Sequence, residues 1–310
     1  MFPRSLVIVN PNGARGGAGR RWQRLEPEMR RALPGAEIAL TGARGDAERL
    51  AREAALAGVQ RVVVAGGDGT LNEVVCGLLG AGLGSRCELG VLPLGTGCDF
   101  ARSLGLPRRP EAALVALTRA TPRAVDAGLL RCVSEEGKPF ERHFVNAASL
   151  GISPLAVKLA SRVPPVVGAS AAFALGTCAA LLRHRSAPVE LRVDGELLAS
   201  APLVLAAVAG GRFFGGGMQV APEARLDDAR FDVVAVEAIA APRLLWKLPK
   251  IYRGTHLSDP IVRSGRGQRV EARAADGTEV LIEADGELLG RLPVELEVLP
   301  GALRVLGPPS

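Results

Sequence analysis

The most informative part of the sequence is Val62–Glu73, VVVAGGDGTLNE. The β-branched run Val62–Ala65 predicts a buried strand, Gly66–Gly69 predicts a tight loop, and a helix is expected to start near Thr70. Glycines let the backbone approach a phosphate closely, and the first N–H groups of a helix attract its charge. Asp68 would repel bare phosphate, but it suits a residue that holds Mg²⁺, orients a nucleophile or caps the helix. Because the loop is richer in glycine than a cap requires, it predicts a phosphate site.

Two further loops repeat this pattern. In Val91–Arg102, VLPLGTGCDFAR, a strand ends in Gly-Thr-Gly, and a helix is expected near Cys98. In Asn10–Gly17, NPNGARGG, a turn follows the strand Leu6–Val9. Loops after parallel strands gather at the carboxyl edge of a sheet, where open α/β folds bind ligands. The chain has neither a P-loop motif nor the motifs of protein kinases, so the three loops predict a different type of nucleotide site.

The two parts of the chain have different patterns. Strands alternate with helices over residues 1–125, which predicts an α/β domain whose parallel sheet is covered on both faces. Its other expected elements are the strands Glu37–Thr41 and Leu89–Leu92 and the helices Arg20–Leu33 and Asp46–Ala57. Over residues 126–310, strands broken by Asp-Gly turns predict an antiparallel β-rich domain with a helical insertion at residues 154–185, and the last residues can pack back on the first domain. The strands expected there are Val189–Val193, Phe231–Val236, Val270–Arg273 and Val280–Glu283, with hairpin turns at Asp194-Gly195, Asp276-Gly277 and Asp285-Gly286.

The composition limits the class of partner. Lys and Arg exceed Asp and Glu by 38 − 32 = 6 residues, which suits anionic partners such as nucleotides or acidic lipid headgroups. Aromatic residues make up 4% of the chain, which leaves little to stack on bases, so no nucleic-acid partner is expected. The five cysteines are never spaced as C-x-x-C, and the three histidines lie far apart. We therefore expect reduced thiols in a cytoplasmic protein and no zinc site.

Three segments bear on membranes. The N-terminus runs into a strand pattern without the features of a signal peptide. Val166–Leu182 is apolar over 17 residues but rich in Ala and Gly, so a buried helix is expected rather than a transmembrane segment. Leu244–Arg253, LLWKLPKIYR, fits either a contact with the membrane interface or a buried amphipathic helix with a basic edge. We expect a cytoplasmic protein that contacts the membrane peripherally, and a homodimer stays open.

Six motifs occur in an order that is similar to a known family. They are Asn10-Pro11-Asn12-Gly13, Gly66–Glu73, Pro93–Arg102, Phe144-x-Asn146 with Gly151, Gly215–Met218 with Pro222-x-Ala224-x-x-Asp227-Asp228, and Asp285-Gly286-Glu287. Together they cover essentially the whole chain. They resemble the diacylglycerol kinase catalytic-domain family, and within it the bacterial soluble lipid kinases.

The resemblance implies a fold, a reaction and a set of site residues. The implied fold is an N-terminal parallel-sheet nucleotide domain of the NAD kinase and diacylglycerol kinase type and a C-terminal antiparallel β-sandwich-like domain. The implied reaction uses ATP and Mg²⁺ to phosphorylate a lipid hydroxyl, with diacylglycerol as the default acceptor. The residues implied at the nucleotide are Asn10, Pro11, Asn12, Gly13, Ala14, Thr41, Gly66, Gly67, Asp68, Gly69, Thr70, Leu71, Asn72, Glu73, Gly95 and Thr96. Those implied at Mg²⁺ are Asp68 and, at a structural site, Asp228 with backbone carbonyls near Arg225 and Arg230; Glu287 is implied as the proton acceptor, with Asp285 as its neighbour.

The chain departs from the family pattern at two positions. Cys98 stands where the family usually has Asn, and Ala229 stands where it usually has Gly. Since Ala adopts positive φ less easily than Gly, the loop of the structural metal is expected to be altered. Both departures leave every carboxylate of the pattern in place.

Two alternatives stay open beside the lipid kinase. A kinase of a soluble substrate, of the NAD kinase type, shares Gly-Gly-Asp-Gly, and a catalytically weak lipid-binding or nucleotide-binding regulator would explain the two departures. The Asp-Gly-Glu sequence is also ambiguous, because it occurs at Asp194–Glu196 as well as at Asp285–Glu287. Only the later copy has the context of the family, since Pro293 and the expected strand Val294–Val298 follow it. We therefore assign the catalytic carboxylates to the later copy.

Overall fold

The chain forms two units. The computed structural model describes residues 4–160, 162–164, 167 and 169–308. Unit 1 comprises residues 1–127 and 300–310, and unit 2 comprises residues 128–299. The predicted fold class, a parallel α/β domain followed by an antiparallel β-rich domain, is confirmed. The domain limits 1–125 and 126–310 stay a prediction.

Unit 1 is built on a parallel sheet with the strand order β2-β1-β3-β4, to which the end of β14 adds a further strand. Its strands are β1 (Ser5–Val9), β2 (Glu37–Leu40), β3 (Arg61–Gly66), β4 (Glu88–Pro93) and the last residues of β14 (Glu287–Gly307). Its helices are the 3-10 helix η1 (Gly13–Gly16), α1 (Gly17–Ala32), α2 (Asp46–Leu56), α3 (Asp68–Gly80), α4 (Asp99–Ser103) and α5 (Pro110–Arg119). The residues of β1, β3 and β4 are almost all buried, as expected for strands covered on both faces.

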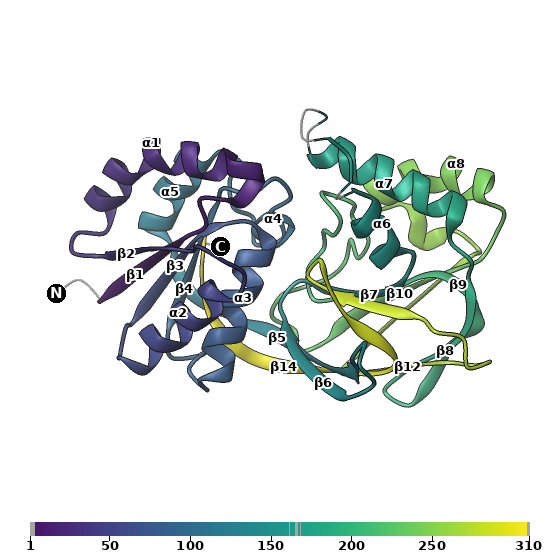
Figure 1. The fold of residues 1–310 in the computed structure, drawn as a ribbon. Helices are drawn as coiled ribbons and strands as arrows, with labels where there is room; N and C mark the ends of the chain where they lie inside the picture. The colour runs from purple at the N-terminus through teal and green to yellow at the C-terminus, as the bar shows by residue number, and fades with distance from the viewer. Residues whose placement is uncertain (1–3, 161, 165–166, 168, 309–310) are drawn as a thin grey trace. The chain divides into compact units, whose positions relative to one another are not determined.

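Helices cover both faces of this sheet (Figure 1). Trp22, Leu25 and Met29 of α1 pack with α5 onto one face. Side chains of that face include Val7 and Val63, which are partners in the parallel register of β1 and β3. α2 and α3 pack against each other on the other face. This arrangement leaves the carboxyl ends of β1, β3 and β4 at one edge of the sheet.

Unit 2 is an antiparallel sheet that closes on itself. Strand pairing runs β7-β13-β14-β12-β8-β9 and returns to β7, and every pair in this ring is antiparallel. β10 and β11 extend the sheet from β9, and β5 and β6 extend it from β14. The bounds are β5 (Thr121–Val133), β6 (Pro139–Phe144), β7 (Ala147–Gly151), β8 (Ala187–Val193), β9 (Glu196–Ala209), β10 (Phe231–Glu237), β11 (Val262–Gly267), β12 (Arg269–Ala274) and β13 (Leu281–Ala284).

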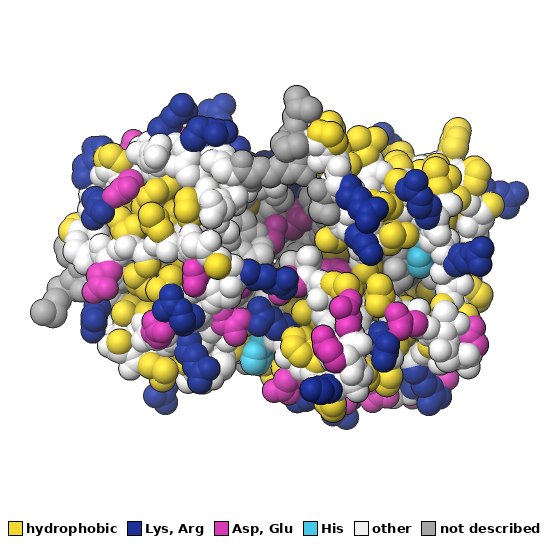
Figure 2. Space-filling model, in the orientation of Figure 1, with side chains coloured by type: hydrophobic (Ala, Val, Ile, Leu, Met, Phe, Trp, Pro, Cys, Tyr) yellow, Lys and Arg dark blue, Asp and Glu magenta, His cyan; other side chains and the backbone are white. Residues whose placement is uncertain are grey.

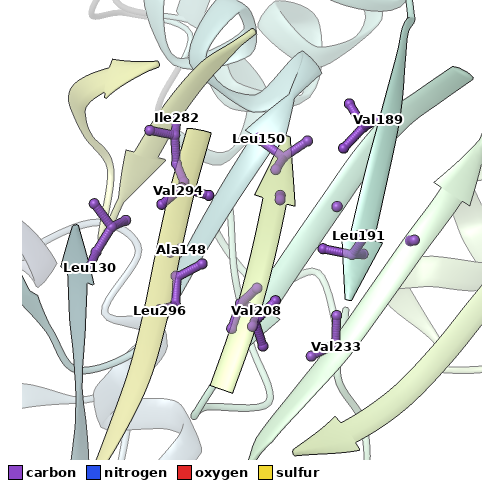
Figure 3. Close-up of a cluster of buried hydrophobic side chains, with 14 of the residues drawn as sticks. Leu130, Ala148, Leu150, Val189, Leu191, Val208, Val233, Ile282, Val294 and Leu296 are labelled. Atoms are coloured by element: carbon purple, nitrogen blue, oxygen red, sulfur yellow. The ribbon is translucent and has the colours of Figure 1, made fainter. Parts of the chain in front are cut away.

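The ring encloses one apolar core, which gives unit 2 its sandwich-like character. Figure 3 shows Leu150, Leu191, Val208, Ile282 and Leu296 among the side chains that converge there from different strands. Because side chains alternate along each strand, every second residue contributes to this core. The helices among the described residues of unit 2 are α6 (Ile152–Ala160), α7 (Ala169–Arg183), α8 (Ala241–Tyr252) and the 3-10 helix η3 (His256–Ser258).

Among its described residues, the predicted insertion at residues 154–185 includes α7 and all of α6 except its first two residues. Of the apolar segment Val166–Leu182, residues 166 and 168 lie outside the described residues, and the part from Ala169 onward belongs to α7. Among the residues that the structure describes, no helix is long and apolar enough to cross a membrane.

Two of the three predicted Asp-Gly hairpins are confirmed, and one is wrong. Asp194-Gly195 joins the paired strands β8 and β9, and Asp285-Gly286 joins the paired strands β13 and β14. Asp276-Gly277 does not make a hairpin, because β12 pairs with β8 and β14 and not with β13. The carboxylate of Asp276 instead accepts the N–H of Thr278 at 2.9 Å. This local turn explains why the sequence resembles a hairpin there.

Candidate active site

The three glycine-rich loops of unit 1 lie together, as the sequence predicts. The amide of Asn10, after β1, donates to the hydroxyl of Thr70 in α3 at 2.9 Å. The side-chain oxygen of Asn10 accepts the N–H groups of Asn12 and Gly13 at 3.1 and 3.0 Å. Asn10 therefore shapes its own loop and ties it to the helix that follows β3.

The loops after β3 and β4 approach each other backbone to backbone. A Cβ atom added to Gly95 would lie 2.5 Å from the Cα atom of Gly67, and one added to Gly66 would lie 2.8 Å from the Cβ atom of Thr70. Only glycine allows these approaches. Beside them Asn12 and Thr96 of the loops and Gly69 in the first turn of α3 are exposed. This arrangement fits the phosphates of a nucleotide, because a side chain in place of the glycines would fill the space.

Asp68 begins α3, and its carboxylate points to the start of α4. Its two oxygens accept the N–H groups of Asp99 and Phe100 at 3.2 and 3.3 Å. Burial raises the pKa of Asp68, and these N–H groups and the charge of Arg102 oppose that rise. The carboxylate is thus fixed at the edge where the loops meet. A half-buried carboxylate in that position is a suitable ligand for the Mg²⁺ that accompanies ATP.

Several residues predicted at the nucleotide have buried side chains. Thr41 and Asn72 are buried, and Leu71 belongs to the core, so a contact of Leu71 with a ligand would involve its backbone. The carboxylate of Glu73 accepts the N–H of Ala47 at 3.1 Å, which places it at the start of α2. Of the rest, Pro11 accepts the N–H of Gly19 at 3.0 Å, and Ala14 has a φ of +51°. Their roles at a nucleotide stay predictions.

In unit 2 the Asp285-Gly286-Glu287 turn is attached firmly to the segment before β7. The N–H of Val145 donates to Oδ2 of Asp285 at 2.8 Å, and those of Asn146 and Ala147 donate to Oδ1 at 3.0 Å each. The N–H of Asp285 donates in turn to the carbonyl of Ala147 at 2.9 Å. The Phe144-x-Asn146 motif and the Asp-Gly-Glu motif, far apart in the sequence, therefore form one structure.

Glu287 follows this turn and lies beside a cation. Its Oε2 atom is 3.6 Å from Nη2 of Arg142, and both side chains are largely buried. The Glu287 side chain retains 15% of its accessible surface. A carboxylate that is largely buried but still reached by solvent suits a group that exchanges a proton with a substrate.

Sequence reasoning missed Glu283, which lies beneath the turn. It is 1% exposed and faces Ser149 across the β13–β7 pair, where its Oε1 atom accepts the Ser149 hydroxyl. Its Oε2 atom accepts the N–H of Gly286 at 2.9 Å. Burial, with the charge of Asp285, raises the pKa of Glu283 to about 8. An acidic residue within the apolar strand VLIEA was the available signal.

Unit 2 contains a cavity of about 700 Å³. Leu288, the residue after Glu287, lines it, as do Leu150, Leu155, Val280 and Leu281. Charged side chains also line it, namely the basic residues Lys158, Arg183 and Arg185 and the acidic residues Glu135 and Glu279. The volume is in the range of ligand pockets, and the lining is mainly apolar with a few polar groups.

The loop predicted to hold a structural metal already has a cation in contact. The carboxylate of Asp228 accepts a bond from the guanidinium of Arg266, whose Nε atom lies 3.3 Å from Asp232. Ala229 adopts a φ of +56° and thus the left-handed conformation that Gly would take. Among the described residues no cluster of three or more His, Cys, Asp or Glu side chains can hold a metal ion. A cation between Asp228 and the backbone carbonyls of Arg225 and Arg230 would therefore compete with Arg266.

Known families match both parts of the chain. Residues 4–130 match the diacylglycerol kinase catalytic domain, and residues 146–307 match the YegS C-terminal NAD kinase beta sandwich-like domain. A protein of Chromohalobacter salexigens named probable lipid kinase YegS-like is 33% identical over 273 residues, which are 87% of this chain and 83% of that protein. A diacylglycerol kinase of Bacillus subtilis is 29% identical over 306 residues, 98% of this chain and 96% of that protein.

A solved structure has the same fold. The crystal structure of a diacylglycerol kinase from Bacillus anthracis covers 99% of this chain and 98% of its own, with a TM-score of 0.74 at 23% identity. At this identity the similarity between the two structures shows a shared fold, whereas the family follows from the sequence matches. The chain therefore belongs to the diacylglycerol kinase catalytic-domain family and is an enzyme of the lipid kinase class.

Proposed function

We propose that this enzyme transfers the γ-phosphoryl group of Mg-ATP to the hydroxyl group of diacylglycerol. Two observations support the proposal: the fixed Asp285-Gly286-Glu287 turn, and a mainly apolar cavity of about 700 Å³ whose lining includes Leu288, the residue after Glu287. Phosphorylation of a lipid alcohol requires a carboxylate that accepts the hydroxyl proton and a pocket that binds acyl chains. The relatives named diacylglycerol kinase support this acceptor.

The loops of unit 1 would bind the nucleotide. The Gly67–Gly95 approach leaves room for phosphates, and the N-terminal turn of α3 directs N–H groups toward that space. In this proposal Asp68 is a ligand of the Mg²⁺ bound to ATP. The ion would neutralise charge on the transferred phosphoryl group.

The turn of unit 2 would accept the proton of the lipid hydroxyl. As the acceptor oxygen bonds to the γ-phosphorus and the bond to ADP breaks, Glu287 takes the hydroxyl proton. Asp285 holds the turn through the N–H groups of Val145, Asn146 and Ala147. Arg142, 3.6 Å from Glu287, keeps that side chain in place.

The open alternatives make different use of the same residues. A kinase of a soluble substrate of the NAD kinase type would have no use for the apolar lining around Leu155 and Val280. A catalytically weak regulator would not need the burial of Glu287. Cytoplasmic localisation, peripheral contact with a membrane and a homodimer stay part of the proposal.

The test is transfer of labelled γ-phosphate from Mg-ATP to diacylglycerol, a sphingoid base, NAD and a sugar phosphate. We expect label in diacylglycerol in mixed micelles. A Val157→Trp variant, which fills part of the cavity, should lower this transfer while leaving ATP binding intact, and Val115→Trp on the exposed side of α5 is its control. Label in NAD or sugar phosphate alone would overturn the lipid assignment, and binding of ATP without transfer to any acceptor would favour the regulator.

The structural Mg²⁺ site needs a separate test, because Arg266 and the ion compete for Asp228. We propose that Mg²⁺ stabilises unit 2 only weakly while Arg266 is present. An Arg266→Gln variant should then show a larger rise in Tm with added Mg²⁺ than the wild type, and Arg269→Gln is the matched control. Equal rises in all three proteins would argue against a metal at Asp228.

A further inference from the structure

Helices α6, α7 and α8 form one layer of unit 2. α6 packs against α7, and α7 packs against α8. Leu155 of α6, Leu181 of α7 and Leu244 of α8 share an apolar cluster with Val204 and Val236 of the sheet. Their inward faces therefore pack on the sheet, and their outward faces point away from it (Figure 1).

The outward face of α8 consists of one tryptophan among cations. Leu248 and Ile251 face inward, where they pack on an apolar cluster of the sheet. Arg243, Trp246 and Lys250 are exposed and follow at intervals of three and four residues, so they lie on one side of the helix, and exposed Arg253 continues the series. Trp246 is 89% exposed. A tryptophan with that exposure has no packing role within the chain.

The stretches of sequence that contain these three helices are free of acidic residues. Residues 142–189 contain no Asp or Glu, and neither do residues 238–258. Glu237, before α8, is paired with Arg263 at 2.9 Å. Asp259, after α8, is buried and accepts bonds from Lys247 and Lys250, the latter at 3.1 Å. With Arg243 and Arg253, α8 and its end thus carry four positive charges against this one negative charge. The excess makes the surface attractive to anions.

Other exposed apolar side chains accompany Trp246. Leu175 and Leu182 of α7 are 53% and 69% exposed, and Tyr252 at the end of α8 is exposed as well. In Figure 2 the surface over α7 and α8 is coloured mainly as hydrophobic and basic side chains. An apolar area of this kind, mixed with cations, marks an interaction site.

We propose that the outward face of α7 and α8 docks on a lipid bilayer that contains anionic headgroups. Tryptophan prefers the boundary between headgroups and acyl chains, and Lys and Arg are attracted to anionic lipids. An amphipathic helix with basic and aromatic residues lies in that boundary. The proposal rests on the lipid kinase function for its purpose, because docking would bring the enzyme to an acceptor that does not leave the membrane. Binding itself requires no catalysis.

The test is binding of the full chain to vesicles of phosphatidylcholine with and without phosphatidylglycerol, in the absence of ATP. The chain has two tryptophans, and Trp22 is buried. The tryptophan emission that responds to contact with lipid therefore comes from Trp246. We expect co-sedimentation with the anionic vesicles and a blue shift of emission. Trp246→Ala should weaken binding about tenfold, since a large apolar side chain is lost from the lipid. Arg243→Glu with Arg253→Glu should weaken it on the order of a hundredfold.

Matched variants in unit 1 control for hydrophobicity and net charge. Leu56→Ala removes another exposed apolar side chain, and Arg24→Glu with Arg86→Glu makes the same change in net charge. Both should bind vesicles as the wild type does. Equal binding by all variants, or no binding to anionic vesicles, would overturn the proposal, as would a dimer that Trp246→Ala dissociates. Because a short-chain soluble acceptor measures catalysis separately, an inactive enzyme that still binds vesicles would refute the kinase function and leave docking intact.

Discussion

The chain contains Asp-Gly-Glu at two hairpin turns, and the two turns differ only in their surroundings. Asp194 and Asp285 both have a φ of +49°, and the glycines that follow both have a φ of +84°. Both Asp carboxylates also accept backbone N–H groups from another segment of the chain. Oδ1 of Asp194 accepts the N–H groups of Gln268 and Arg269 at 2.9 Å each. The tripeptide therefore determines the local backbone at both places.

The surroundings give the two turns different chemistry. Asp194 and Glu196 are exposed, whereas Asp285 and Glu287 are partly buried. Among the described residues, only the later turn has an arginine 3.6 Å from its glutamate and a buried second carboxyl group at Glu283, and the residue that follows it, Leu288, lines a mainly apolar cavity. Sequence motif and backbone geometry alone are thus insufficient for a site, since burial, charge and an adjacent cavity are also needed.

The largest expected difference between the turns is in turnover. Glu287→Gln removes the proposed proton acceptor and should lower kcat about 10²- to 10⁴-fold. Glu196→Gln makes the same chemical change on the exposed turn and should leave kcat unchanged. Initial rates of lipid phosphorylation at saturating ATP measure both. Similar losses in the two variants would remove the distinction between the turns.

The next difference is in stability. Asp285→Asn replaces one of two carboxylate oxygens, both of which accept N–H groups, with an NH2 group that can only donate, and the free energy of unfolding should fall by about 3 kcal/mol. Asp194→Asn should cost less than half as much, because water can reach the exposed turn. Thermal unfolding followed by circular dichroism gives the comparison. A larger loss for Asp194→Asn would mean that the later turn is not the more constrained one.

Glu283 gives the later turn a pH dependence that the earlier turn lacks. Its pKa is raised from 4.5 to about 8 in the folded protein, so the folded state holds a proton that the unfolded state has lost between these values. The associated stability is present below about pH 4.5 and is lost as the pH rises through about 8. Glu283→Gln, which stays neutral, should flatten the fall of Tm between pH 5 and 8. Glu279→Gln, an exposed control, should reproduce the wild-type curve, and a wild-type Tm that does not fall would contradict the burial argument.

The smallest expected effect concerns left-handed residues whose side chains carry no carboxylate. Ala229 and Cys98 have φ values of +56° and +51°. The side chain of Ala cannot compensate for this conformation as the carboxylates of Asp194 and Asp285 do. Ala229→Gly should therefore raise the free energy of unfolding by about 1 kcal/mol. Denaturant unfolding checks the value, and a loss of stability would show that the Ala229 methyl group contributes packing that outweighs the strain.

The sequence predicted local structure well and the chemical environment less well. The strand–loop–helix turns around Asp68 and the hairpins at Asp194 and Asp285 follow from glycine placement and apolar runs, which act over a few residues. The hairpin at Asp276 was wrong because strand pairing is decided across the whole sheet. Glu283 was missed because its burial depends on Ser149, more than a hundred residues earlier in the chain.

Of the two Asp-Gly-Glu turns, the one at Asp285–Glu287 is the turn that we propose to be catalytic. The most direct measurement compares two double variants in the transfer of labelled γ-phosphate from Mg-ATP to diacylglycerol. Asp194→Asn with Glu196→Gln should form phosphatidic acid at the wild-type rate. Asp285→Asn with Glu287→Gln should bind ATP but form no product above the rate without enzyme. Product formation by the second variant, or its loss in both, would contradict the assignment of catalysis to the later turn.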